Sequence, residues 1–179
     1  MSSSEIEGKE HGQCIQWQDS AHSPETNSSG RDFLLKAPCG QSAAEARERG
    51  CRFGMLYFAW LPEQCYDEKI EEDFKNFKEW KFWLFQNRTG EITWDEAATG
   101  EYDRLYAEWE QHQRHCVDMF RRLHRVMASS SGLLSIDSHL SDWDHTEHCS
   151  RVLMERERSI HDLNSVRRLK YPDCGLLRW

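Results

Sequence analysis

The chain has 179 residues, which is enough for a single domain with a hydrophobic core, and 12% of its residues are aromatic. Its formal net charge is −8, and it has neither a basic run nor a basic face interleaved with aromatic residues, so we expect no nucleic acid among its partners. No window is long and apolar enough to suggest a membrane span.

Residues 1–32 are rich in Ser, Glu, Gly and His and contain almost no apolar residues. Too little apolar surface is available there to offset the entropy of ordering, so we predict a disordered polar tail. The folded domain is expected over 33–179. No apolar stretch of signal-peptide length occurs near the start of this tail.

Capping boxes predict two short helices, over 41–50 and 93–100. In each segment a hydroxyl residue, Ser42 or Thr93, is followed three residues later by glutamate, and the segment ends in glycine. The hydroxyl can accept a hydrogen bond from the amide of that glutamate, and glycine suits the end of a helix.

Two segments between these boxes are rich in aromatic residues. Residues 53–60 form an apolar run that is too short and too aromatic to indicate a helix, so we expect a buried extended or loop segment. Residues 66–85 carry apolar side chains at helical spacing and predict an amphipathic helix. We interpret its aromatic stripe as part of the core.

The pentapeptide His-x-x-His-Cys occurs twice, at 112–116 and 145–149. Apolar residues around the first copy recur at spacings of four and three, which predicts a helix that begins near Tyr102. A second helix is predicted from 141 to 163, with a weaker apolar stripe. Residues three and four apart share a helix face, so each copy would place two imidazoles and a thiol on one side.

Together these segments predict a mainly α fold, a single small helical domain of four to five helices with irregular connections. If the two motif helices pack together, their histidines can surround a metal site. The expected ligands are His112, His115, His145 and His148. Imidazoles without carboxylates favour copper, or alternatively zinc, but spacing fixes neither the metal nor the number of ions. Hydrogen-bonded core histidines are the alternative interpretation.

The cysteines allow two interpretations of the motifs. Cys116 and Cys149 either ligate the metal as thiolates or form a disulfide that joins the two helices, and we favour the disulfide. A bridge between Cys39 and Cys51 would close a small helical loop. One further expected bridge then joins Cys65 to Cys174.

The cysteines and a glycosylation sequon at Asn87 suggest the secretory-pathway lumen or secretion. Because neither a signal peptide nor a transmembrane segment is visible, a cytoplasmic location also stays open. A homodimer is a further hypothesis, since two His pairs could complete sites across a subunit boundary.

The doubled motif resembles the signature of the UstYa-like proteins of filamentous fungi, the oxidase-like family named from ustiloxin biosynthesis. The resemblance covers about residues 38–175 and extends to segments 39–51, 58–67, 119–125, 136–139 and 171–174. It implies an oxidoreductase that tailors fungal secondary metabolites, acting on a peptide or polyketide-type substrate by oxidative cyclisation, hydroxylation or halogenation. It also implies copper, held by the four motif histidines.

The chain departs from the family pattern in two places. Such proteins usually carry a hydrophobic membrane segment before the domain, whereas residues 1–32 here are polar, and a charged run follows the second motif at Ser150.

Behind the ligands, His139 and Asp144 are candidates to orient a ligating imidazole. The competing hypothesis is a non-catalytic lumenal module, with structural zinc or disulfide-joined helices, that partners another enzyme.

Overall fold

The computed structural model describes residues 35–128 and 134–177. The contacts between residues group Arg31–Trp179 into one compact unit. The polar tail predicted over 1–32 lies outside the described residues.

The fold mixes α and β structure, so the prediction of a mainly α domain was wrong. The described residues form five α-helices, one 3₁₀ turn and eight strands that pair in antiparallel sheets. In chain order the elements are α1 (Ala43–Glu48), β1 (Arg52–Gly54), β2 (Ala59–Leu61), η1 (Glu63–Cys65), α2 (Glu68–Lys75), β3 (Phe82–Trp83), β4 (Glu91–Ile92), α3 (Trp94–Ala97), β5 (Arg104–Ala107), α4 (Trp109–Ala128), β6 (Leu134–Asp137), α5 (Trp143–Met154), β7 (Ser165–Arg168) and β8 (Cys174–Leu177).

We did not predict the strands, because each has only two to four residues, which is too few to show alternation of apolar and polar side chains. Of the helix predicted over 66–85 only α2 is formed, and Phe82 and Trp83 near its predicted end belong to β3. Leu105, which we assigned to the first motif helix, lies in β5, and α4 begins at Trp109. The second motif helix ends at Met154, well before residue 163.

The local capping signals were confirmed. Ser42 caps α1 by accepting a hydrogen bond from the amide of Glu45. Thr93 and Glu96 form both hydrogen bonds of a capping box at the start of α3. These signals succeed because they involve residues only three positions apart, whereas strand pairing depends on distant partners.

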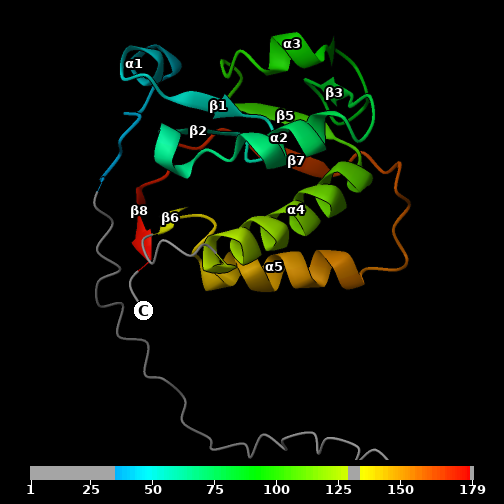
Figure 1. Ribbon diagram of the computed structural model, residues 1–179. Coiled ribbons are helices and arrows are strands. Elements are labelled where there is room, and N and C mark those ends of the chain that lie inside the picture. Colours follow the sequence, from blue (N-terminus) through cyan, green and yellow to red (C-terminus); the bar gives the residue numbers. More distant parts are fainter. Residues whose placement is uncertain (1–34, 129–133, 178–179) are drawn as a thin grey trace, which may run out of the picture. The chain divides into compact units, whose positions relative to one another are not determined.

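A four-stranded sheet in the order β4-β3-β5-β7 covers one side of α4, and α5 packs on α4 away from these strands (Figure 1). In this sheet Leu105 pairs with Arg167, which brings β7 toward the first motif helix. The core is continuous from residues 53–61 through the sheet to α4 and α5. The two motif helices therefore lie inside the packed part of the domain.

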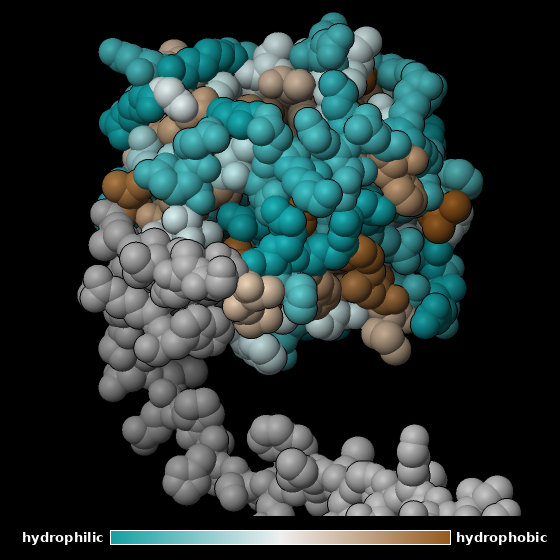
Figure 2. Space-filling model, viewed as in Figure 1, coloured by the Kyte–Doolittle hydropathy of each residue, from teal (hydrophilic) through white to brown (hydrophobic). Residues whose placement is uncertain are grey.

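Ion pairs tie α2 to α4. Asp118 on α4 is fully buried, and its carboxylate accepts hydrogen bonds from Arg114 and Arg121 at 2.6 and 2.7 Å. Arg121 also donates to Asp73 on α2 at 2.6 Å. On the face shown in Figure 2, hydrophobic side chains lie in small separate patches among hydrophilic ones. Among the described helices, none is long and apolar enough to cross a membrane.

Two disulfides join the cysteines that we paired outside the motifs, Cys39 with Cys51 and Cys65 with Cys174. They agree with an oxidising secretory environment. The disulfide predicted between Cys116 and Cys149 is not formed, because both residues are buried free thiols. Helical spacing correctly placed the two cysteines on facing helices, but it could not distinguish a bonded pair from two neighbouring thiols.

The two disulfides close chain segments of very different length, with separations of 109 residues for Cys65–Cys174 and 12 for Cys39–Cys51. A longer closed loop removes more entropy from the unfolded chain, so we expect about 5 kcal/mol from the first bond and about 3 kcal/mol from the second. Denaturant unfolding of the two double Cys→Ala variants measures this order. Equal losses, or a larger loss at Cys39–Cys51, would contradict it.

Candidate metal centre

The packing of α4 on α5 brings the two motifs together as two cross-helix histidine pairs. The Nε2 atoms of His112 and His148 lie 2.9 Å apart, and those of His115 and His145 lie 3.3 Å apart. The four predicted ligands are therefore neighbours, arranged pair by pair.

The second motif reaches this position because of the way α5 begins. The Asp142 side chain caps the helix by accepting a hydrogen bond from the amide of Asp144. His145, Cys149 and Val152 then follow at spacings of four and three, and they form the buried face of α5. On α4, His115 and Cys116 are buried while His112 is half-buried.

The distances within each pair fit a bound metal ion. Two nitrogens held at about 2.0–2.1 Å from one ion lie about 2.9 Å apart at a right angle and about 3.3 Å apart at a tetrahedral angle. The observed separations of 2.9 and 3.3 Å match these values. Each pair could therefore supply two adjacent ligands to an ion without rearrangement of the helices.

Cys149 adds a sulfur ligand to one of the pairs. Its Sγ atom lies 3.7 Å from Nε2 of His145, and the ligand atoms of His115, His145 and Cys149 all lie within 4.8 Å of one another. All three side chains are buried, with exposed fractions of 4, 9 and 1%. His112 and His148 form an adjacent pair outside this group of three.

Of the two free thiols, Cys149 is the one whose surroundings suit a metal ligand. A hydrogen bond from Cys116 lowers the pKa of Cys149 to about 5, whereas the same contact, together with burial, raises the pKa of Cys116. The contacts of Cys149 with Cys116 and His145 thus favour the thiolate form of Cys149. A thiolate is the form of cysteine that binds a metal.

The imidazoles of α4 are held in the neutral form that a metal requires. Burial, followed by the charge of Arg167, keeps the pKa of His115 well below its usual range. Burial first, and then Arg167 and His148, lowers the pKa of His112 to about 3. Both rings therefore present a lone pair at neutral pH.

His115 is oriented by a backbone carbonyl. Its Nδ1 atom lies 2.8 Å from the carbonyl oxygen of Leu56, and because a carbonyl can only accept, the imidazole proton must be on Nδ1. This leaves the Nε2 lone pair facing His145. Carbonyl groups commonly fix metal-binding histidines in this way.

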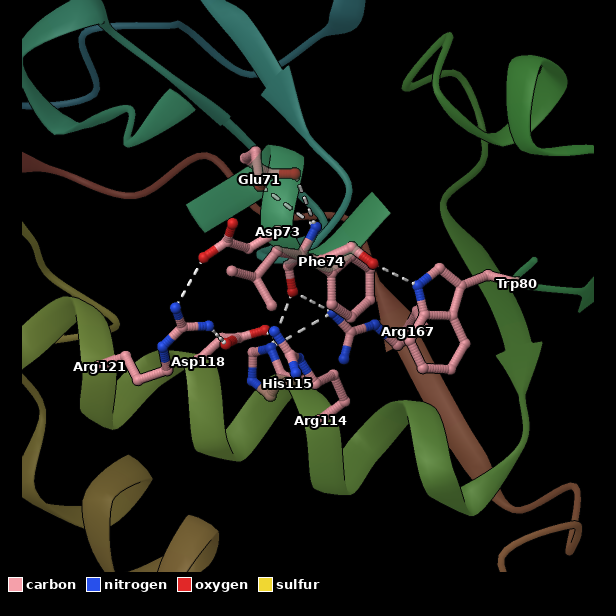
Figure 3. A network of polar contacts seen from close by, with 10 residues as sticks. Glu71, Asp73, Phe74, Trp80, Arg114, His115, Asp118, Arg121 and Arg167 are labelled. Carbon is pink, nitrogen blue, oxygen red and sulfur yellow. Dashed lines mark hydrogen bonds and ion pairs between the residues drawn. The ribbon is translucent and has the colours of Figure 1, made fainter. Parts of the chain in front are cut away.

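Two buried ionisable residues, Glu71 and Arg167, hold the backbone of Leu56 in place. Arg167 donates a hydrogen bond to the Leu56 carbonyl, and its Nη2 atom lies 3.4 Å from Nδ1 of His115. The Leu56 amide donates to both carboxylate oxygens of Glu71 at 3.2 Å. Figure 3 shows His115 and Arg167 converging from one side of this group and Glu71 lying on the other.

Sequence reasoning missed Leu56, Glu71 and Arg167, because a backbone carbonyl has no residue signature and the two charged residues belong to no motif. One signal exists in hindsight at Gly54. A Cβ atom there would lie 2.5 Å from a Glu71 oxygen, so any other residue would displace the Glu71 carboxyl group from this position.

The structure separates the two residues that we expected to orient the ligands. His139 stacks on His145, with ring centroids 3.8 Å apart and planes inclined by 30°. Asp144 is exposed in the first turn of α5, and among the described residues no hydrogen bond joins its carboxylate to a motif histidine. His139 thus lies against the centre, whereas Asp144 does not.

His112 is less constrained than His115. Its Nδ1 atom is buried without a hydrogen-bond partner among the described residues, and its ring meets the edge of Trp109 at a centroid distance of 5.0 Å.

The predicted glycosylation residue, Asn87, lies in an exposed turn, where its side chain accepts hydrogen bonds from the backbone and hydroxyl of Thr89.

Comparison with known proteins relates the chain to fungal biosynthesis. It is similar to the phomopsin biosynthesis cluster proteins B and B′ of Diaporthe leptostromiformis, with 23% identity over 133 residues in each case. The match covers 69% of this chain but only 38% of the length of each relative. No protein-family profile matches the chain, and no solved structure matches it. The chain is thus distantly similar to proteins of a fungal secondary-metabolite cluster.

The burial of Glu71 makes the stability of the domain depend on pH. Burial raises its pKa from about 4.5 to about 8, despite the opposing effects of the Leu56 amide and Arg167. Between these values the folded state keeps a proton that the unfolded chain releases. The contribution of Glu71 to the free energy of unfolding should therefore fall as pH rises from 4.5 to 8, by up to about 1.4 kcal/mol per pH unit. The lowered pKa values of His112 and His115 act in the opposite direction below about 6.5, so the Glu71 contribution is measured as a difference between variant and wild type.

Glu71→Gln keeps an acceptor for the Leu56 amide but cannot ionise, so the free energy of unfolding, measured at several pH values, should lose this contribution relative to the wild type. Glu72→Gln, at an exposed position of the same helix, is the matched control and should keep the slope. An unchanged slope in Glu71→Gln would contradict the assignment.

Proposed function

We propose that the chain is a UstYa-like, copper-dependent oxidase-type enzyme that tailors a fungal secondary metabolite. The observation that carries this proposal is the buried group of His115, His145 and Cys149 beside the His112–His148 pair. The distant similarity to phomopsin cluster proteins supports the biosynthetic setting.

The donor set supports copper, with zinc as the alternative. Imidazole suits both metals, and thiolate binds both. When bound, copper supplies one-electron redox chemistry and the activation of oxygen. The low pKa values of His112 and His115 and the lowered pKa of Cys149 suit these residues to hold such an ion, since a metal binds the deprotonated forms.

The chain's own residues contribute position and a dry environment. The Leu56 carbonyl and Arg167 hold His115 in one orientation, which fixes where its Nε2 lone pair points. Burial of the three ligand side chains excludes bulk water from that side. The less constrained His112 is the ligand that can most easily make room for a substrate.

Substrate and setting extend the proposal. A peptide or polyketide-type substrate would undergo oxidative cyclisation, hydroxylation or halogenation, in keeping with the family resemblance. The two disulfides support a secretory-pathway lumen as the place of action. Because the chain spans 38% of the length of its relatives, we do not transfer their whole activity to it. A homodimer is a separate part of this proposal.

A second candidate function, a non-catalytic module with structural zinc, is favoured by one observation. A mixed Cys/His group that is almost fully buried resembles the closed sites in which zinc supports a fold. Such a domain would lose its structure together with its metal.

Metal titration of variants tests the centre. His115→Ala, His145→Ala and Cys149→Ser should each weaken copper(I) binding by at least about 100-fold, because even residues behind the ligands typically contribute 10–100-fold. His124→Ala is the matched control, since His124 is exposed on the same helix and should leave affinity unchanged. Competition with a chromophoric chelator measures the affinities, and elemental analysis identifies the metal that copurifies.

Wild-type affinity in His115→Ala and His145→Ala would contradict the proposed centre. Copurified zinc at one equivalent, with unfolding on chelation, would support the structural module and overturn the oxidase. Copper that is removed without loss of the near-ultraviolet circular dichroism signal would support the oxidase.

A further inference from the structure

A small cavity lies next to the candidate metal centre, where the end of β7 passes the start of α5. Its volume is about 350 Å³, and it is lined by Ser138, His139, Asp142, Lys170, Tyr171 and Pro172. Ligand sites typically begin at roughly this size. The cavity is therefore large enough for one amino-acid-sized part of a ligand.

One imidazole ring separates this cavity from the metal ligands. His139 lines the cavity and stacks on His145 at a centroid distance of 3.8 Å. His145 in turn faces His115 across the two helices. The His139 ring would thus separate a group bound in the cavity from the candidate ligand His145.

The charges around the cavity favour an anion. Lys170 lines it and donates a hydrogen bond to the carbonyl of Arg168 at 3.2 Å, but within the described residues it forms no ion pair with a carboxylate. Arg167 is buried nearby, and among the described residues it also forms no ion pair with a carboxylate. A sheltered cation without a counter-ion costs free energy that an anionic ligand would recover.

The electrostatic cost of this arrangement is visible at Lys170. Burial first, and then the charge of Arg167, lowers the pKa of Lys170 to about 7, and Asp137 opposes this only in part. The acidic residue in the cavity lining, Asp142, accepts a hydrogen bond from the amide of Asp144 as the cap of α5. Among the described residues, neither aspartate forms an ion pair with Lys170.

A hydroxyl group adds a second donor. Ser138 Oγ accepts a hydrogen bond from the amide of Asp173 at 3.1 Å, so its own proton can be donated to a ligand. A lysine ammonium and a hydroxyl together suit the two oxygens of a carboxylate.

We propose that this cavity binds a carboxylate group of the substrate through Lys170 and Ser138, and so places the adjoining carbon atoms toward the metal centre. This inference rests on the proposed function, because the bound carboxylate is a substrate only if the protein is an enzyme. The substrate class is thereby a carboxylic acid, such as a peptide with a free carboxyl terminus or an acidic side chain.

Binding of a matched pair of probes to the metal-free protein tests the inference. N-acetylglycine carries the carboxylate, and N-acetylglycinamide replaces it with a neutral amide of the same shape. Each is titrated into ¹⁵N-labelled protein while the amide signals of residues 138–142 and 170–173 are followed. We expect N-acetylglycine to shift these signals and to bind at least about 10-fold more tightly than the amide, because the charge-assisted hydrogen bond is lost in the amide.

Variants locate the interaction. Lys170→Met should weaken N-acetylglycine binding by about 10-fold or more, and Lys170→Arg, which keeps the charge, should restore most of it. Lys69→Met, at an exposed lysine of α2, is the matched control and should bind the probe like the wild type. The comparison of the two probes needs only the wild-type protein, so it stands even if Lys170→Met does not fold.

Equal binding of the two probes, no shifts with either, or unchanged binding in Lys170→Met would overturn the inference. Inorganic phosphate that binds at the same signals more tightly than N-acetylglycine would overturn the assignment to carboxylates. Because the probes are used without metal, a failure of the copper proposal would leave carboxylate binding intact. Conversely, copper binding that persists in Lys170→Met would show that only the cavity had been altered.

Discussion

The structure depends on a buried turn. Met55, Leu56, Tyr57 and Phe58 connect β1 to β2, and all four are at most 3% exposed. Turns usually lie at the surface, because buried peptide groups need hydrogen-bond partners. Here Glu71 accepts from the Leu56 amide, while His115 and Arg167 donate to its carbonyl. The backbone of one residue, Leu56, therefore joins α2, α4 and β7, and its carbonyl also orients a candidate metal ligand.

This arrangement links stability to the proposed chemistry. Arg167 donates a hydrogen bond to the turn, and after burial its charge is the main cause that lowers the pKa of His115. Glu71 accepts from the other side of the turn, and its own burial raises the pKa of its carboxyl group to about 8. Removal of any one partner would leave a buried polar group unpaired, which is costly in itself. The candidate ligands can therefore be rigid at His115 and more adaptable at His112. The cavity lined by His139 lies next to the His115–His145 pair.

Much of the candidate site could be predicted from the sequence, but little of the sheet could. The doubled motif has a strong helical spacing, and it correctly indicated that the histidines of α4 and α5 face one another. The caps of α1 and α3 followed from contacts three residues apart. By contrast, strands of two to four residues have no readable period, so the fold appeared more helical than it is. The support from Leu56 depends on a turn distant in sequence from both motifs, and the free thiols of Cys116 and Cys149 depend on geometry that spacing does not reveal.

The central claim is that the Leu56 carbonyl fixes the tautomer of His115 so that Nε2 is free to bind a metal. Long-range ¹H–¹⁵N correlation spectra of the histidine rings report the tautomer directly. In the metal-free protein we expect the His115 proton on Nδ1, and on addition of zinc, a diamagnetic probe, we expect the Nε2 signals of His115 and His145 to shift together. A proton on Nε2 of His115, or zinc saturation without a shift of either ring, would contradict this account.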